Sequence, residues 1–550
     1  MQQHRHPTQR GFALLILLAL VGVIVGAAVL TVMAKDSTSK TARTAKTEQA
    51  LYAAKQALIA YAAGVQLSAT GCPKPDLNGY CARPGDLPCP DLDNDGWADP
   101  CPNSTSNNSK LIGRLPWRTL GLPDLRDGDG ERLWYAVSSK FVDYPRLLAT
   151  TSPTTVCTVV GQSSCLNSNT TGFITVRDFR ANVVNDGTKQ ATAAVAVIIA
   201  PGAILTRLDK TTPQDRSCTG DSNLANCQDT SLVTYHVCTG TGTLPNKVYT
   251  GTALCNPVNY LEIARSPVLS VGGTIGNQED NANFTEGATT NGFISGPITD
   301  PSVTGPNPPV KINDIIMPLT FADVMVPVQR RVAQEVLKCL TTYAAANGNR
   351  YPWASAISSS NVTIPKCADP SSLRPLTRTS GTPFPIVSQS FYDVTGTYFG
   401  HVPDSGADGF ACTQNSQPTM STGWTGSCNI NPTSGWWLNW KDLVFYGVAA
   451  GYSPAGASAC TGTNCLTVSP LPGNKQVVVV VGGPPIAPTG TTQQRPNITS
   501  PSCASSPLCG NYVSNYLEGT NATAPGTGAG GWVYQTGSAN STFNDLVVYQ

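Results

Sequence analysis

Acidic side chains in one short stretch could provide the oxygen ligands of a metal ion. The stretch has alternating carboxylates, a glycine and a further carboxylate: Asp91, Asp93, Asp95, Gly96 and Asp99. Ca²⁺ binds about six to eight oxygens, alternating carboxylates in a tight turn supply several, and a glycine permits the bend. The bidentate Glu of an EF-hand is missing, because Pro102 holds its position. The stretch therefore predicts a short calcium loop, with an ordinary Asp/Asn/Gly turn as the alternative.

A second acidic, glycine-rich turn gives a weaker metal signal, and catalytic motifs are scarce. This turn contains Asp124, Asp127, Asp129 and Glu131. Only two histidines, His236 and His401, lie beyond the first ten residues, and the HExxH, GxSxG and GK[ST] patterns are absent. We therefore do not expect an enzyme. A hydrolase that uses loop carboxylates remains an alternative, because aspartates are plentiful in the loops.

The cysteines predict an oxidising compartment. There are 18, without any CxxC pair that would favour a metal site. Short loops between neighbouring cysteines are typical of exported, disulfide-bonded proteins. The disulfide candidates, grouped with their nearest neighbours, are Cys72/Cys81, Cys89/Cys101, Cys157/Cys165, Cys218/Cys227, Cys238/Cys255, Cys339/Cys367, Cys412/Cys428, Cys460/Cys465 and Cys503/Cys509. The connectivity itself cannot be deduced from spacing.

The overall composition favours loops and strands over a helical bundle. Charged residues make up 13% of the chain, which is about half the usual share, and there are 51 glycines and 43 prolines. The formal net charge is +1, and no run of lysines or arginines occurs. Nucleic acid is therefore not a predicted partner.

An uncharged segment near the N-terminus predicts a membrane span. Phe12 to Met33 contains 22 residues, and Arg5 and Arg10 precede it. As a helix it would measure about 33 Å, enough to cross a bilayer core. The preceding arginines favour a cytoplasmic N-terminus and export of the chain beyond the span. An uncleaved signal anchor and a cleaved secretory signal are the alternatives.

The junction Gln9-Arg10-Gly11-Phe12, together with the apolar segment after it, resembles the type IV prepilin signature. The resemblance covers about 25 residues. It implies that a prepilin peptidase cuts between Gly11 and Phe12 and that Phe12 becomes N-methylated. The family usually has Glu at the fifth mature position, but this chain has Ile16. That departure is similar to a subset of minor pilins and tip-type pseudopilins, and it argues against a bulk filament subunit.

Several motifs recur in the same order in the two halves of the chain. The helical Leu58-Ile-Ala-Tyr-Ala-Ala is matched by Leu340-Thr-Thr-Tyr-Ala-Ala, and apolar runs begin at both 133 and 443. The remaining matches are the strands 193–199 and 477–481, the motifs 259–262 and 515–518, and the motifs 312–316 and 543–547. We interpret the series as an internal duplication, with a single large β domain as the alternative.

The sequence therefore predicts an α+β fold: a long N-terminal transmembrane pilin-type helix followed by two tandem, disulfide-stapled pilin-like heads, each with a helix on an antiparallel sheet. The expected parts are a prepilin leader (1–11), the N-terminal helix (12–64, with its membrane part at 12–33), the first head (65–320) and the second head (321–550).

The expected function is that of a minor pilin or pseudopilin in, or at the tip of, a type IV pilus-like or type II secretion filament. Its expected partners are prepilin peptidase, other pilins or pseudopilins and the inner membrane, and Ca²⁺ is the one expected cofactor. The expected location is the bacterial inner membrane with the head in the periplasm, and afterwards the pilus or cell surface. A membrane-anchored adhesin or recognition module that does not polymerise is the first alternative, and an anchored extracellular hydrolase is the second.

Overall fold

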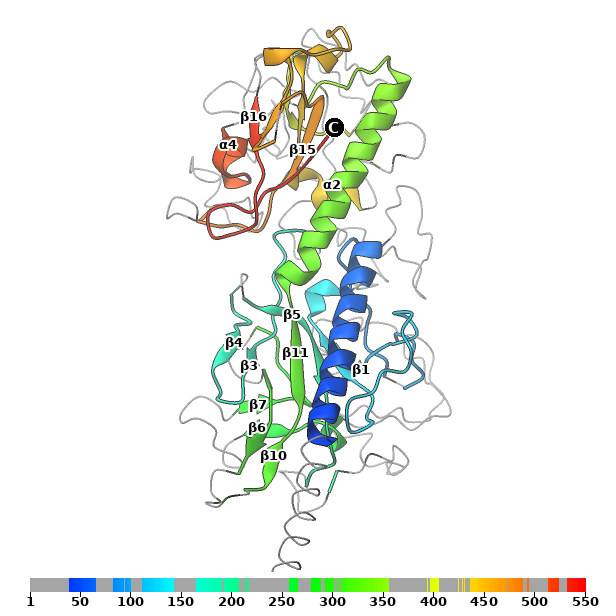
Figure 1. Ribbon diagram of the computed structural model, residues 1–550, viewed down its shortest axis with the longest axis vertical. Helices are drawn as coiled ribbons and strands as arrows, with labels where there is room; N and C mark the ends of the chain where they lie inside the picture. Colours follow the sequence, from blue (N-terminus) through cyan, green and yellow to red (C-terminus); the bar gives the residue numbers. More distant parts are fainter. Residues whose placement is uncertain are drawn as a thin grey trace, which may run out of the picture.

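The computed structural model describes residues 39–550 with gaps, the larger ones at 66–82, 100–110, 143–164, 217–256, 266–277, 356–392, 405–423, 494–512 and 524–531. The described residues form two helix-and-sheet units that lie one above the other along the long axis (Figure 1). Below, residues up to 320 are called the first unit and those from 321 the second unit.

The first unit begins with a helix over residues 39–64, drawn in blue in Figure 1. Its Ala, Lys, Gln and Leu residues favour helix, and neither Pro nor Gly occurs before Gly64. Leu51, Ala54 and Leu58 recur at helical spacing and are buried in the same hydrophobic core as the strands of the first sheet.

The first sheet is antiparallel and has the strand order β1-β2-β5-β11. Its strands are β1 (Ile112–Arg114), β2 (Trp134–Val137), β5 (Ala194–Ala200) and β11 (Ile315–Thr320). Every residue of β5 is buried, because this central strand of Ala, Val and Ile is covered on both faces.

Smaller sheets flank the first one. They contain β3 (Val176–Arg177), β4 (Val183–Asn185) and β8 (Phe293–Ile294); β6 (Ile263–Arg265) and β7 (Gln278–Asp280); and β9 (Ile298–Thr299) and β10 (Val310–Ile312). Among the described residues of this unit, 3₁₀ turns occur at Ser139–Phe141 and Pro257–Asn259.

The second unit repeats the strand order of the first. Its antiparallel sheet runs β12-β13-β15-β17, with β12 (Phe399–His401), β13 (Val444–Val448), β15 (Val477–Val481) and β17 (Leu546–Tyr549). Alternate valines of β15 enter different cores: Val477 and Val479 join the core that contains helix α2 (Phe321–Ala346), whereas Val478 joins a core on the opposite face.

The other elements of the second unit are short. They are α3 (Trp437–Trp440), α4 (Gly519–Ala522), the parallel pair β14 (Thr467–Ser469) and β16 (Val533–Gln535), and the 3₁₀ turns Lys441–Leu443, Ala450–Tyr452, Gly462–Asn464 and Val513–Asn515.

The two units share a strand-to-helix junction and a buried polar interface. Strand β11 ends at Thr320 and α2 begins at Phe321, with Thr320 as the N-cap of a capping box. Gln329 of α2 donates a hydrogen bond to Ser168 of the first unit (3.0 Å), whose hydroxyl donates to the carbonyl of Gly482 (2.7 Å). These groups are buried, so their hydrogen bonds fix the contact geometrically.

The predicted fold class is wrong as stated. Among the described residues, no helix combines the length and the apolar character needed to cross a bilayer. The helix over 39–64 carries Lys, Arg, Glu and Gln on its outer side, and most of the other regular structure lies in small antiparallel sheets. The predicted span, 12–33, lies outside the described residues.

The predicted location is corrected on the same finding. We expected an inner-membrane protein with a periplasmic head, later found at the pilus or cell surface. That expectation requires a membrane-spanning helix, and the described part of the chain contains no such helix. The expected disulfide stapling is found in part, because Cys339–Cys428 and Cys460–Cys465 are bonded.

Candidate functional site around the first helix

The first described turns of helix 39–64 are exposed. Residues 39–46 are all exposed, although they are helical, and burial begins only at Thr47 and Ala50. Lys40, Arg43 and Lys46 give this exposed segment a positive charge. A helical segment with so much exposed surface gains little from packing within its own chain, which makes it a candidate contact for another molecule.

One tight turn, residues 127–131, holds the helix at the point where it meets the body. The backbone N–H of Gly128 donates a hydrogen bond to Thr47 Oγ1 (2.9 Å), and Arg43 pairs with Asp129 (3.2 Å). A Cβ on Gly128 would lie 2.3 Å from the carbonyl oxygen of Arg43. Glycine is therefore required here by the close approach of two backbones.

Asp127 is the centre of this turn. Its side chain is fully buried; Oδ1 accepts hydrogen bonds from the N–H groups of Asp129 and Glu131 (both 2.9 Å), and Oδ2 accepts one from Gly202 (2.9 Å). The carboxylate thus organises the loop and joins it to the end of β5. Three amide donors satisfy a buried carboxylate without a cation.

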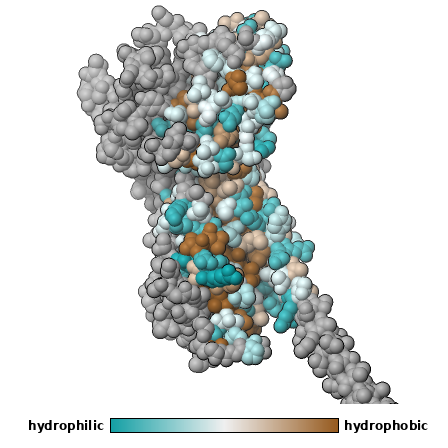
Figure 2. All heavy atoms as spheres, turned by 60° about the vertical axis from the view of Figure 1, so that its left-hand side comes forward, coloured by the Kyte–Doolittle hydropathy of each residue, from teal (hydrophilic) through white to brown (hydrophobic). Residues whose placement is uncertain are grey.

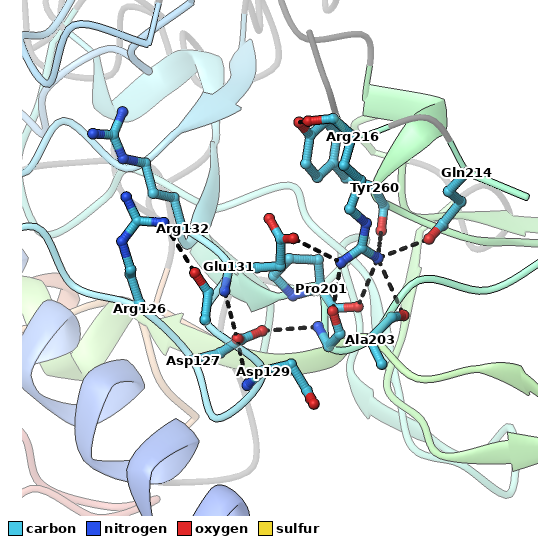
Figure 3. A network of polar contacts seen from close by, with 12 residues as sticks. Arg126, Asp127, Asp129, Glu131, Arg132, Pro201, Ala203, Gln214, Arg216 and Tyr260 are labelled. Atoms are coloured by element: carbon cyan, nitrogen blue, oxygen red, sulfur yellow. Dashed lines mark hydrogen bonds and ion pairs between the residues drawn. The ribbon is translucent and has the colours of Figure 1, made fainter.

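The neighbouring Asp124 is an ion-pair partner. Arg126 and Arg132 contact its two oxygens at 2.7 and 2.9 Å. Partial burial raises the pKa of Asp124, but the hydrogen bonds from Arg132 and Arg126 outweigh burial and hold this pKa below its ordinary value. The acidic turn that suggested a second metal site is therefore a network of ion pairs and backbone caps (Figure 3).

Arg216 joins this turn to the rest of the first unit. Its side chain is 5% exposed; one guanidinium nitrogen lies 3.5 Å from a carboxylate oxygen of Glu131, and the other donates to Gln214 Oε1 (2.7 Å). Further bonds reach the carbonyls of Pro201, Ala203 and Tyr260, so that the guanidinium bridges three segments (Figure 3). Nothing in its sequence neighbourhood marks this arginine.

The ring of Tyr260 lies between two arginines. The guanidinium carbons of Arg114 and Arg216 are 4.1 and 5.4 Å from its ring centroid. Burial lowers the pKa of Arg114 to about 10. Cation–π contacts of this kind stabilise a desolvated guanidinium, and Arg216 connects the stack to Glu131 of the turn.

Comparison with known proteins leaves the family open. No protein-family model matches the chain, and no curated protein or solved structure matches it. The resemblance to prepilins rests on residues 9–33, which, with the predicted cleavage site Gly11–Phe12, lie outside the described residues.

The predicted calcium loop is ordered by its own hydrogen bonds. Asp91 is 1% exposed and accepts from the N–H groups of Asn94 (2.6 Å), Asp95 (3.2 Å) and Gly96 (2.8 Å). Asp99 accepts from the N–H of Leu92, and Asp93 lies outside the described residues. Among the residues that are described, no group of three or more His, Cys, Asp or Glu could hold a metal. Bound Ca²⁺ stays a prediction.

The structure also re-pairs some of the predicted cysteines. Cys339 bonds to Cys428 and not to its sequence neighbour, whereas Cys460 bonds to Cys465 as the spacing suggested. Cys89 and Cys165 are disulfide-bonded as well. The other candidates lie outside the described residues: Cys72, Cys81, Cys101, Cys157, Cys218, Cys227, Cys238, Cys255, Cys367, Cys412, Cys503 and Cys509.

We expect Gly128→Ala to loosen the first helix. The added Cβ would meet the Arg43 carbonyl at 2.3 Å, so the turn must move away and weaken the Thr47 and Arg43 contacts. The expected cost is about 1–3 kcal/mol of unfolding free energy. Hydrogen exchange should speed up over residues 39–50.

Gly64→Ala is the matched control, because nothing lies within 4 Å of a Cβ built there. It should be neutral or slightly stabilising. Equal unfolding midpoints and equal exchange in the two alanine variants would contradict the proposed role of the turn.

Proposed function

We propose that the chain is a minor subunit of a type IV pilus-like or type II secretion filament and that it joins neighbouring subunits through the exposed start of helix 39–64. One observation carries the proposal: Leu51, Ala54 and Leu58 bury the later turns against the first sheet, while residues 39–46 are helical yet each of them is exposed. An exposed helical stretch of this kind is free to pack against another molecule.

The exposed segment has the composition of a helix–helix contact. Ser39, Thr41, Ala42, Thr44 and Ala45 are small, so a partner helix could approach closely. The positive side chains between them would set the register against an acidic stripe on that partner. The rest of the unit would then be carried outside the contact.

Processing by a prepilin peptidase is part of the same proposal. The enzyme would cut between Gly11 and Phe12, and Phe12 would become the methylated N-terminus. Ile16, at the fifth mature position, would make the chain a low-copy subunit at a tip or initiation point, because the family's usual Glu is missing there. Other pilins or pseudopilins are the implied partners.

A second candidate, a recognition module that does not polymerise, is favoured by one surface feature. Phe179 is 50% exposed, and Val183 and Val184 of β4 are 47% and 55% exposed. In the view of Figure 2, apolar atoms gather on the face of the first unit that is turned toward the viewer. Asp178 caps this turn through the N–H groups of Arg180 and Asn182, so the aromatic is presented on fixed backbone. Exposed apolar groups on a rigid turn suit partner binding.

Co-purification with filaments distinguishes the two candidates. In cells that assemble such filaments, Ala42→Trp should lower recovery of the chain in the sedimented filament fraction by about tenfold, because a bulky ring would block close helix contact; that corresponds to about 1.4 kcal/mol of association free energy. The mature chain in that fraction should begin at methylated Phe12, as measured by intact mass and N-terminal sequencing.

Ala539→Trp is the control, because Ala539 is also exposed but lies in the second unit. It should leave recovery unchanged. Equal recovery of the two tryptophan variants, or a mature chain that begins at Lys35, would contradict the filament proposal.

A further inference from the structure

Each unit contains a buried pair of carboxyl groups in the same place. In the first unit Glu262 and Asp314 are 4% and 0% exposed, and in the second Glu518 and Asp545 are 1% and 4% exposed. The glutamate ends a short connector that begins after a 3₁₀ turn, and the aspartate lies beside the last strand of the sheet, β11 or β17. In each unit, therefore, the pair joins the same two segments: the connector and the residue before the last strand.

The glutamates have donors on both carboxyl oxygens. Glu262 Oε1 accepts from the side-chain amide of Gln214 (2.7 Å), and Oε2 accepts from the N–H groups of Asn313 (3.0 Å) and Asp314 (3.2 Å). Both oxygens of Glu262 therefore act as hydrogen-bond acceptors, and this pattern favours the ionised form of the glutamate.

Glu518 repeats the arrangement. Oε1 accepts from the side-chain amide of Gln493 (2.7 Å), and Oε2 accepts from the N–H of Asn544 (3.0 Å). The two glutamates thus accept hydrogen bonds from equivalent donors.

The aspartates use only one oxygen as an acceptor. Asp314 Oδ2 accepts from the N–H of Glu262 (2.9 Å) and the side-chain amide of Asn281 (2.8 Å). Asp545 Oδ2 accepts from the N–H of Glu518 (2.9 Å) and the side-chain amide of Asn521 (3.0 Å). In both residues Oδ1 is buried and has no donor. A buried oxygen without a donor is accounted for when it carries a proton.

We infer that each unit holds one proton in a carboxyl–carboxylate bond, with the proton on Asp314 Oδ1 or Asp545 Oδ1 and the glutamate as its acceptor. The bond closes the connector onto the last strand. Loss of that proton would leave two negative charges together in a buried site. We therefore expect alkaline pH to break the bond and to release the connector from the last strand.

Burial and the neighbouring charges shift the pKa values of Glu262 and of both aspartates. Burial, and then the charge of the partner glutamate, raises the pKa of both aspartates well above its ordinary value, and burial raises the pKa of Glu262 to about 7. Arg216 lowers the pKa values of Glu262 and Asp314 and is itself paired with Glu131. In the second unit the donors around the pair are the amides of Gln493, Asn521 and Asn544.

The sign of the pH effect comes from these shifts. Carboxyls whose pKa is raised on folding bind more protons in the native state than in the unfolded state, so stability is greatest at acid pH and falls as pH rises. For the first pair the fall should begin near pH 4, the ordinary carboxyl value, and continue past about 7. The two pairs should make the full chain more stable at pH 5 than at pH 8.

Matched amide substitutions test where the proton lies. In Asp314→Asn and Asp545→Asn, the new Nδ2 would donate to the glutamate in place of the proton, so the melting temperature at pH 8 should hold or rise and its fall between pH 5 and 8 should shrink. In Glu262→Gln and Glu518→Gln, an NH₂ would face another N–H donor, so the melting temperature should drop at every pH.

An infrared measurement on the full chain gives a direct readout. At pH 7 the wild-type protein should show the C=O stretch of protonated carboxylic acid; Asp314→Asn or Asp545→Asn should each reduce this band, and the double variant should remove it. Glutamine variants as stable as the asparagine variants, or a band that survives in the double variant, would overturn the inference.

Discussion

Replacing Lys441 with methionine is expected to destabilise the second unit by about 3–5 kcal/mol. Lys441 Nζ lies 2.9 Å from Asp404 Oδ2, and the two side chains are 8% and 0% exposed. The same carboxylate oxygen accepts a hydrogen bond from Trp437 Nε1 (2.8 Å). Removing the ammonium would take away the ion-pair partner that lies 2.9 Å from the buried carboxylate of Asp404, and the loss of one partner of a buried ion pair is costly.

The double variant Lys441→Met with Asp404→Asn is the matched control. The amide removes the buried charge and keeps an oxygen acceptor for Trp437, so most of the lost stability should return. Denaturant unfolding of the single and double variants measures the difference. If both lose the same free energy, the ion pair is not the source of the effect.

Removing the disulfide Cys339–Cys428 is expected to cost about 4 kcal/mol. The bond joins α2 to a residue 89 positions away, so it strongly restricts the unfolded chain. The double variant Cys339→Ala with Cys428→Ala should therefore unfold at a much lower denaturant concentration than the wild type. The bond Cys460–Cys465 spans only 5 positions.

Removing Cys460–Cys465 by the same alanine substitutions should cost about 2 kcal/mol, because a short loop loses less entropy when it is closed. The comparison is made on oxidised protein with the other disulfides intact. Equal losses in the two double variants would show that loop entropy does not set the contribution of these bonds.

The repeated motifs of the sequence identified segments that meet in space. The motifs that end at Glu262 and Glu518 and those that contain Asp314 and Asp545 are far apart in the sequence, yet each glutamate donates its N–H to the aspartate of its own unit. The apolar strands around 193–199 and 477–481 were also predictable, because runs of Val, Ile and Ala are typical of buried strands. The sequence patterns located these segments, but they did not show that the two carboxyl groups of each unit form a buried pair.

Other parts of the structure depend on geometry that the sequence does not encode locally. Cys339 lies on α2 and bonds to Cys428, which is 89 positions away in the sequence. Arg216 acquires its role from three segments that fold around it. The expected transmembrane class rested on residues 12–33, which lie outside the described residues, and no helix of the described part is long and apolar enough to cross a membrane.

The direct passage from β11 into α2 has a mechanical consequence. Without a loop at Thr320 and Phe321, a pull on the second unit would act along β11, whose six residues are paired with β5, and would load that ladder in shear. Beside this junction, Lys55 of the first helix pairs with Asp323 (2.8 Å) and donates to the carbonyl of Pro318 (3.2 Å). Tension on the chain would therefore pass directly from one unit to the next, without first extending a linker.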